Sequence, residues 1–271
     1  MSDVKLKAAV CGVSGRLGRT IAAQLIARAD TALTGGMVSS DSVHLGADLG
    51  EIAGKGYLGR TVSVSLEEAG EGADLFIDVT APQVTAAIAS RLAEAGGPGL
   101  VTGVTGLDDA QQKALETAAQ TIPVLQASNF SLGVAVLERL VAEAARALNP
   151  DQFDLEIVET HHKHKADAPS GTALTLGKAA ARARGADFDK AAQFDRPRSG
   201  GSRPLGTIGF AALRGGGVVG EHEARFLSSL EEVSIGHRAF DRTIFARGAI
   251  EAALWLKGRE PGFYTMQDVL G

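Results

Sequence analysis

The chain has little cysteine, little proline and no long apolar run, and each shortage narrows the kind of protein it can be. Cys11 is the only cysteine among 271 residues, so no intramolecular disulfide can form and a cysteine-rich zinc site is excluded. The first residues, MSDVKLKAAV, lack the apolar core of a signal peptide, and no apolar stretch is long enough to span a bilayer. We therefore expect a soluble, cytoplasmic protein with no membrane partner.

A large excess of charge of one sign is also missing. The net charge is −5, so no global positive field attracts nucleic acid or anionic lipid, and any anion must be bound by a local cluster. The combination of 34 glycines with only 8 prolines suits an enzyme with many tight turns. The length allows one large domain or two modest ones.

The first half of the sequence alternates short apolar strands with alanine-rich helices. Helical spacing places Leu17, Ile21 and Leu25 on one face, and Pro82 is tolerated in a first helical turn. Strand–helix alternation with short connections predicts a parallel, doubly wound sheet. The predicted strands cover residues 6–13, 31–40, 73–80, 99–106 and 121–128, and the helices cover 16–29, a segment opening near 82, and 108–119.

The pattern changes after Asn129. Alternation in FDLEIVET predicts a half-exposed strand, and three later runs complete a mixed or antiparallel sheet. We therefore predict an α/β protein with a first domain over 1–130, a second, α+β domain over 131–240, and a final segment, 241–271, that packs back on the first. The helices are predicted at 132–148, from about 171, and at 243–257, the strands at 153–160, 205–214, 218–227 and 231–240, and a mobile loop at 181–203.

The segment GVSGRLG places Gly12, Gly15 and Gly18 after a strand and before a helix. The first glycine permits a tight turn, the second lets the backbone approach a pyrophosphate, and the third lets helix and strand pack closely. Two hypotheses remain. The context favours a dinucleotide-binding turn with the anion at the helix N-terminus and Arg16 near a phosphate; the alternative is a structural turn with a solvated arginine.

An acid that binds the ribose 2′-hydroxyl of NAD is expected about 20 residues further on. That segment has Val38, Ser39 and Ser40, and its first acid is Asp41. Small hydroxyl groups do not repel a 2′-phosphate, so we expect NADPH to be accepted at least as well as NADH.

The stretch VETHHKHKADAPSGTAL places three histidines and two lysines within residues 161–165. Three hypotheses compete. The histidines could bind a metal, although zinc needs three or four ligands and the lysines add positive charge. The cluster could be a hydrated basic loop. In the catalytic hypothesis, a histidine and a lysine serve an anionic substrate whose carboxylate is bound by PSGT at a helix N-terminus near Gly171.

This stretch resembles the signature of the 4-hydroxy-tetrahydrodipicolinate reductase (dihydrodipicolinate reductase) family, E-x-H-H-x-x-K-x-D-A-P-S-G-T-A. Every fixed position is present, from Glu159 to Ala173. GVSGRLGR is similar to the family's G-x-x-G-R-M-G-R, with Leu17 in place of methionine. FIDVT, GVTG, ASNFSLGV, GTIGF, GEH and ALWL follow in the family's order, so the resemblance covers essentially the whole chain.

The resemblance implies a Rossmann-like first domain, an NAD(P)H-dependent oxidoreductase of lysine and diaminopimelate biosynthesis, a cyclic imine dicarboxylate substrate, a homotetramer built through the sheet of the second domain, and no metal. It gives His161 an acid–base role and Lys165 that of proton donor. Many members carry an acid and an arginine where this chain has Val38 and Ser39. The implied substrate-binding residues are His162, Ser170, Gly171 and Thr172, and the implied cofactor-binding residues are Gly12, Val13, Ser14, Gly15, Arg16, Leu17, Gly103, Val104, Thr105, Ala127, Ser128, Asn129 and Phe130.

The chemistry implied is transfer of hydride to C4 of the unsaturated imine, after which C3 of the resulting enamine takes a proton. The sequence leaves open whether His161 or Lys165 delivers that proton directly. Two other functions stay open, an amino-acid dehydrogenase or similar NAD(P)-dependent oxidoreductase, and a non-catalytic dinucleotide-binding regulator. A regulator needs no proton donor, which argues against the latter.

Several other polar residues invite a functional interpretation. His222 and His237 on alternating strands are expected to be structural. Glu221 and Glu223 share a strand face, as paired catalytic carboxylates would, but no second pair lies nearby in the sequence. Arg242 either adds charge near the substrate or is an ordinary surface arginine.

Overall fold

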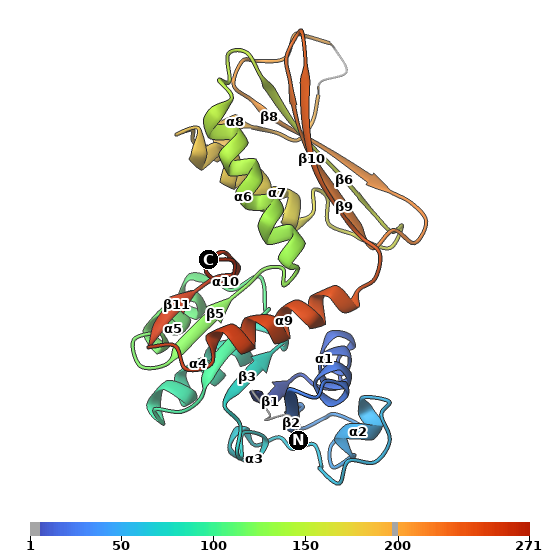
Figure 1. The fold of residues 1–271 in the computed structure, drawn as a ribbon, viewed down its shortest axis with the longest axis vertical. Helices are drawn as coiled ribbons and strands as arrows, with labels where there is room; N and C mark the ends of the chain where they lie inside the picture. Colours follow the sequence, from blue (N-terminus) through green and yellow to red (C-terminus); the bar gives the residue numbers. More distant parts are fainter. Residues whose placement is uncertain (1–5, 197–199) are drawn as a thin grey trace. The chain divides into compact units, whose positions relative to one another are not determined.

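The computed structural model describes residues 6–196 and 200–271, which form two compact units (Figure 1). Unit 1 combines the described residues up to Ser131 with Thr243–Gly271, and unit 2 is Leu132–Arg242. Unit 1 contains a parallel sheet and unit 2 a mixed one. The predicted α/β class, with a doubly wound sheet followed by an α+β region, is confirmed.

The sheet of unit 1 has six strands in the order β11-β5-β4-β3-β1-β2, and every neighbouring pair is parallel. Because the strands are parallel, all their carboxyl ends meet at one edge, where loops can gather around a ligand. The edge strand β11 was not predicted. The bounds are β1 (Leu6–Cys11), β2 (Thr31–Met37), β3 (Leu75–Asp78), β4 (Gly99–Thr102), β5 (Pro123–Gln126) and β11 (Gly262–Tyr264).

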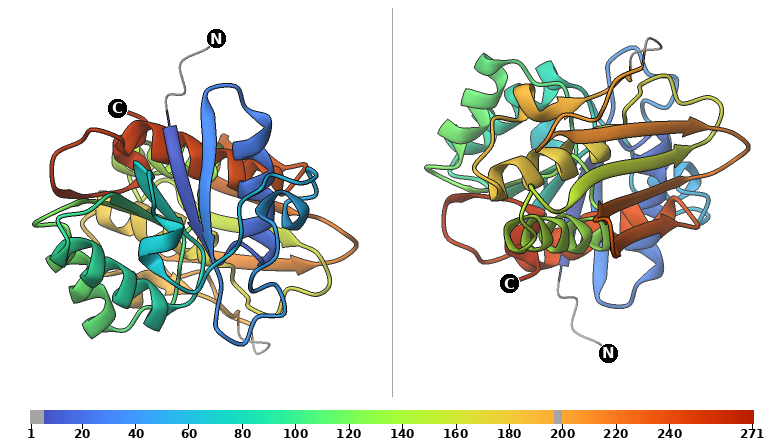
Figure 2. Two further views of the ribbon diagram at one scale, coloured as in Figure 1. Left: turned by 90° about the horizontal axis from the view of Figure 1, so that it is seen from below. Right: turned by 90° about the horizontal axis from the view of Figure 1, so that it is seen from above.

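Helices pack on both faces of this sheet. The helices α4 and α5 contact each other over a core that includes Phe76, Leu100 and Leu115, and α1 packs against α9 (Figure 2). The three short helices of unit 1 were not predicted, because four residues carry no readable periodicity. The bounds are α1 (Arg16–Ala27), α2 (Leu49–Ile52), α3 (Leu66–Ala69), α4 (Pro82–Glu94), α5 (Asp109–Ala118), α9 (Thr243–Leu256) and α10 (Met266–Val269).

The sheet of unit 2 has the order β10-β9-β6-β8-β7. β6 pairs parallel with β8 and antiparallel with β9, so these two consecutive strands flank β6 instead of pairing with each other. Their glycine-rich connection passes the carboxyl end of β6, where Gly215 N donates to His161 O at 2.9 Å. The bounds are β6 (Asp154–His161), β7 (Ala192–Gln193), β8 (Ile208–Arg214), β9 (Gly220–Leu227) and β10 (Glu232–Ala239).

One face of this sheet is packed by α6 (Leu132–Ala147) and α7 (Gly171–Ala183). Leu137, Leu176, Phe210 and Phe226 belong to the apolar core between these helices and the strands. The prediction of a loop from residue 181 is wrong for residues 181–193, because α7 continues to Ala183 and α8 (Phe188–Ala191) and β7 follow. Residues 197–199 of that predicted loop lie outside the described residues.

Candidate active site

The glycine-rich turn of unit 1 joins β1 to α1. Gly12 has φ +79°, a conformation that favours glycine. A Cβ on Gly18 would lie 2.1 Å from the carbonyl oxygen of Gly12, so α1 can approach the turn this closely only with glycine there. Gly15 and Arg16 are exposed at the start of the helix. The turn therefore fits a diphosphate at the helix N-terminus; Val13, Ser14 and Leu17 complete it.

Two further segments follow β4 and β5 at the same sheet edge. Gly103 N donates to Asp78 O at 2.9 Å, and a Cβ on Gly103 would lie 2.4 Å from the ring of Phe130. This contact places the segment after β4 directly against the segment after β5. The two segments are Gly103, Val104 and Thr105, and Ala127, Ser128, Asn129 and Phe130, and the structure thus brings them to one edge with the glycine turn.

Asp78, at the end of β3, was not singled out from the sequence. Its carboxylate is fully buried and accepts hydrogen bonds from the hydroxyls of Thr80, Thr85 and Thr102 at 2.6, 2.5 and 3.0 Å. Burial raises the pKa of Asp78, although these hydrogen bonds act in the opposite direction. Because its partners come from β4 and α4, Asp78 fixes the strand ends around the candidate nicotinamide segments.

The segment after β2 carries no acid at its first exposed positions. Val38 is buried, whereas Ser39 is exposed, and a hydrogen bond from Ser39 lowers the pKa of Asp41. A cation lies nearby in the fold. Arg19 on α1 donates from Nε to Ser14 O at 2.8 Å, and its Nη2 lies 2.7 Å from Nε2 of His44. Arg19 therefore connects the glycine turn to the segment that follows β2.

In unit 2, the face of β6 that points toward the helices changes from apolar to polar along the strand. Leu155 and Ile157 are buried in the apolar core, and Glu159 and His161 continue the same face at the carboxyl end. Glu159 is 1% exposed and His161 is 8% exposed. A carboxylate and an imidazole on a core-facing row need partners, because an unpaired buried charge is costly.

The carboxylate of Glu159 is the centre of a hydrogen-bond cluster. It accepts from Nδ1 of His161 at 2.6 Å, from two guanidinium nitrogens of Arg214 at 2.7 Å each, and from Ser170 N at 3.0 Å. Burial alone would raise the pKa of Glu159, but the hydrogen bonds from Arg214, His161 and Ser170 outweigh it and lower the pKa. Glu159 is therefore ionised, and no role for it or for Arg214 was expected from the sequence.

The basic residues after β6 differ in their surroundings. Partial burial and the charges of Arg242, His164, His161 and Lys165 lower the pKa of His162, so its ring is mainly neutral at pH 7. Nδ1 of His162 is buried, and no group in the described part of the chain bonds to it. Nζ of Lys165 lies 2.9 Å from a carboxylate oxygen of Asp167, while Lys163 and His164 are exposed.

The PSGT segment opens α7. Ser170 is its N-cap, with Oγ accepting from Ala173 N at 3.2 Å, and Gly171 is exposed at the first helical position. The first turn of a helix offers N–H groups that lack intrahelical acceptors, which suits a carboxylate. Behind this turn lies His222, whose pKa is lowered to about 4 by burial and by the electrostatic effect of His161. Thr172, half-buried, completes the turn.

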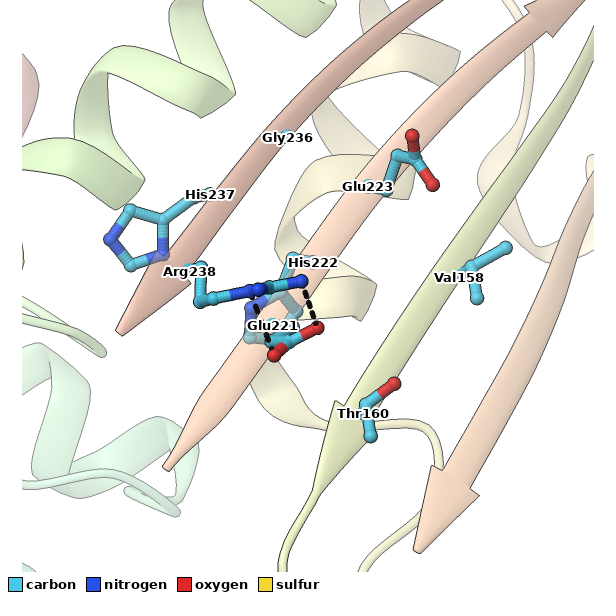
Figure 3. Close-up of a pocket in the computed structure, with 8 residues that line it drawn as sticks. All are labelled: Val158, Thr160, Glu221, His222, Glu223, Gly236, His237 and Arg238. Atoms are coloured by element: carbon cyan, nitrogen blue, oxygen red, sulfur yellow. Dashed lines mark hydrogen bonds and ion pairs between the residues drawn. The ribbon is translucent and has the colours of Figure 1, made fainter. Parts of the chain in front are cut away.

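The opposite face of the same sheet carries a groove of about 300 Å³. Thr160 lines it, and His161, the next residue on β6, points to the other face. Figure 3 shows Glu221 joined to Arg238 on this face, a contact of 2.8 Å. Ion pairing to Arg238 leaves Glu221 and Glu223 unlike a catalytic carboxylate pair. The groove is lined by Val158, Thr160, Glu221, His222, Glu223, Gly236, His237 and Arg238.

The structure thus collects the sequence-predicted residues in two places, one in each unit. The carboxyl edge of the parallel sheet holds the dinucleotide candidates, and the end of β6 with the start of α7 holds His161, His162, Lys165 and the Ser170–Thr172 turn. Within residues 6–196 and 200–271, no group of three or more histidine, cysteine, aspartate or glutamate side chains is arranged to hold a metal ion. No helix in these ranges is both long and apolar enough to cross a membrane.

Family models match nearly the whole chain in two parts. Residues 6–130 match the one described as "Dihydrodipicolinate reductase, N-terminus", and residues 133–270 match "Dihydrodipicolinate reductase, C-terminus". The first part contains the glycine turn and five of the six strands of the parallel sheet, β1 to β5, and the second contains the cluster around Glu159 and the edge strand β11.

Solved structures share the fold at low sequence identity. A dipicolinate-bound dihydrodipicolinate reductase from Paenisporosarcina sp. TG-14 is 19% identical, with a TM-score of 0.77 over 97% of this chain and 98% of that chain. A protein from gentamicin A biosynthesis, in complex with NAD, is 16% identical, with a TM-score of 0.59 over 98% of this chain and 90% of that chain. An aspartate semialdehyde dehydrogenase with NADP from Candida albicans is 13% identical, with a TM-score of 0.50 over 82% and 71%.

Proposed function

The chain belongs to the dihydrodipicolinate reductase family, and on this premise we propose that it reduces 4-hydroxy-tetrahydrodipicolinate, through dihydrodipicolinate, to tetrahydrodipicolinate. NADPH or NADH is the reductant, and the reaction belongs to lysine and diaminopimelate biosynthesis. The observation that carries the proposal is the cluster in unit 2, where one buried carboxylate holds both the imidazole of His161 and the backbone of Ser170. A proton-transferring group and a carboxylate-binding turn are thereby fixed together.

The residues of unit 1 fit the cofactor. Gly12 to Leu17 would hold the diphosphate, and the segments 103–105 and 127–130 would line the nicotinamide side. When bound, the reduced nicotinamide supplies the hydride that adds to C4 of the substrate. Asp78 supports this region by tying β3, β4 and α4 together.

The residues of unit 2 bind the substrate and move the proton. The first turn of α7, with Ser170, Gly171 and Thr172, would hold one carboxylate, and His162 with Lys165 would hold the other. Since Glu159 is an ionised acceptor, the hydrogen shared with His161 lies on Nδ1, which leaves Nε2 of His161 for proton transfer. The His161–Lys165 pair delivers the proton to C3 after hydride transfer.

The assay for this function follows nicotinamide absorbance while the upstream synthase generates the substrate in place. Oxidation of NADPH or NADH that depends on the synthase supports the proposal. If the cofactor is oxidised no faster with the synthase than without it, the proposal is contradicted. Amino acids with oxidised cofactor test the dehydrogenase alternative, and cofactor binding without any turnover would favour the regulator. Pyridine-2,6-dicarboxylate should raise the melting temperature of the cofactor-bound protein.

For the cofactor, we propose that NADPH is accepted at least as well as NADH. Val38, Ser39 and Ser40 place no carboxylate at the expected ribose position, and Arg19 brings a cation to the segment after β2 through His44. Michaelis constants for the two cofactors test this proposal, and a strong preference for NADH would contradict it.

We further propose that the protein is a homotetramer assembled through the sheet of unit 2. The helices α6 and α7 pack on one face only, and on the other face Val158 is half-buried, Ala211 is exposed and Leu213 is 51% exposed. Light scattering should give the mass of four chains, and Leu213→Glu should lower it. A monomeric wild-type protein would contradict the proposal.

A further inference from the structure

We propose that Glu159 is a positioning residue of the reaction, with a buried carboxylate that fixes the orientation and the Nδ1–H tautomer of His161, and that Arg214 is its obligatory counter-charge. The inference deepens the reductase function proposed above and rests on it for its kinetic consequences. Its structural consequence, the position of one hydrogen on His161, can be observed without turnover.

The first support is that both oxygens of the Glu159 carboxylate accept hydrogen bonds. Oε2 accepts from Nδ1 of His161 at 2.6 Å and from Nη1 of Arg214 at 2.7 Å, whereas Oε1 accepts from Nη2 of Arg214 at 2.7 Å and from Ser170 N at 3.0 Å. Each oxygen therefore meets two donors, and an ionised carboxylate donates nothing in return. The imidazole can satisfy this arrangement only with its hydrogen on Nδ1.

The second support is the position of Arg214 in the sheet. β8 runs parallel to β6 with Arg214 in register with His161, so the two side chains leave the sheet on the same face. The Arg214 side chain is 19% exposed, and its guanidinium makes a bidentate pair with Glu159. It also donates from Nη2 to Asp167 O at 2.6 Å, which holds the segment between His161 and Ser170.

The third support is the connection between the two functional parts of unit 2. Ser170 N donates to the same carboxylate that holds the imidazole, so the distance between the proton-transferring ring and the first turn of α7 depends on Glu159. A substrate whose carboxylate binds at that turn is thereby placed at a fixed distance from His161. In this arrangement the carboxylate of Glu159 orients His161, as buried carboxylates do for catalytic histidines.

Replacement of Glu159 by glutamine tests the tautomer directly. The new amide has one oxygen and one NH₂ group, and at either position the NH₂ group faces a guanidinium nitrogen of Arg214, which is a donor only. At the Oε1 position it would also face Ser170 N, a second donor, whereas at the Oε2 position it faces Nδ1 of His161, which can become an acceptor by moving its hydrogen to Nε2. The Oε2 position therefore leaves fewer opposed donors and is the one we expect. We expect wild-type His161 to be the Nδ1–H tautomer and His161 in Glu159→Gln to be the Nε2–H tautomer.

The experiment uses the full-length protein labelled with ¹⁵N-histidine and records ring ¹⁵N–¹H correlations at about pH 8, where an ordinary histidine ring is neutral. Loss of signals in His161→Gln assigns the ring. In parallel, kcat of Glu159→Gln should fall about a hundredfold, the size of a general acid–base contribution, with the dissociation constant of NADPH unchanged. Glu143→Gln is the matched control, because Glu143 pairs with Arg146 at 2.6 Å on the exposed surface of α6.

Three outcomes separate the two proposals. An Nε2–H tautomer in the wild-type protein overturns the positioning role even if the variant does not fold. An unchanged tautomer and unchanged kcat in Glu159→Gln overturn it as well. A wild-type protein that shows the Nδ1–H tautomer but no synthase-dependent turnover supports the positioning of His161 and refutes the reductase function.

Discussion

The hydroxyl oxygen of Ser170 lies 3.0 Å from Nε2 of His222, and both side chains are buried in unit 2. The same oxygen accepts a hydrogen bond from Ala173 N and thereby caps α7. Because one lone pair is used in this way, the hydroxyl can donate its hydrogen to the neutral imidazole. A single serine therefore joins the first turn of α7 to β9, beside the cluster around Glu159.

Ser170→Ala should lower the free energy of unfolding by about 2 kcal/mol, because it removes a helix cap and leaves a ring nitrogen of His222 buried without its partner. Urea denaturation followed by circular dichroism measures the loss. The control is Ser65→Ala, which removes the cap of the short helix α3 but leaves no buried histidine behind. Equal losses in the two variants would show that the contact with His222 is unimportant.

His222 should make the protein less stable as the pH falls from about 6.5 to about 4. Burial and the neighbouring His161 lower its pKa in the folded protein to about 4, from an ordinary value of 6.5. Within this window the unfolded chain binds a proton that the folded protein does not, so the stability decreases with decreasing pH. Between pH 7 and pH 4, His222→Gln should lose up to about 3 kcal/mol less stability than the wild-type protein. Parallel pH profiles for the two proteins would contradict the lowered pKa.

His161→Gln and Lys165→Ala should each lower kcat about a hundredfold or more, because each removes a member of the proposed proton-transferring pair. Both residues lie in unit 2, so the dissociation constant of NADPH, measured by fluorescence titration, should change little. Near-normal turnover in both variants would refute their assignment.

Gly220→Ala should lower kcat about tenfold and leave the fold intact. A Cβ at this position would lie 3.0 Å from Nε2 of His161, in the space that proton transfer requires. Gly220 does not have a positive φ, so alanine fits its backbone conformation. Gly217→Ala is the control, because no atom lies within 4 Å of its Cβ position. An unchanged kcat in Gly220→Ala would place the proton route elsewhere.

Gly15→Ala should raise the dissociation constant of NADPH about tenfold, since the second glycine of the turn lets the backbone approach the diphosphate. The new Cβ would lie 3.2 Å from Gly12 O and project from an exposed position. Calorimetric titration measures the change, with Gly217→Ala again as the control. Unaltered affinity would mean that the turn does not bind the diphosphate.

Much of the fold was predictable because its elements are long enough to show a period. The strands near Leu6 and Leu75 and the helices from Arg16 and Asp109 were all expected, although the structure shortens their ends by one to a few residues. The missed elements, such as α2, α3 and β11, have three or four residues and carry no period of their own. Their formation depends on neighbours, as when β11 adds to the edge of β5.

The glycine turn and the motif from Glu159 to Ala173 lie within short stretches, so the order of residues alone was enough to indicate the family and the candidate residues. The sequence could also have indicated a role for Glu159. Leu155, Ile157, Glu159 and His161 alternate onto one buried face, and a buried carboxylate requires a partner.

The identity of that partner became visible only in the folded chain. Arg214 lies 55 residues from Glu159 in the sequence, and His222 lies 52 residues from Ser170. No local sequence pattern connects positions this far apart. The order β9-β6-β8 places one strand on each side of β6, so the physical reason is register. Pairing across the sheet sets Arg214 and His222 beside the end of β6, where the charge of Arg214 and the hydrogen bonds of both side chains fix the surroundings of His161.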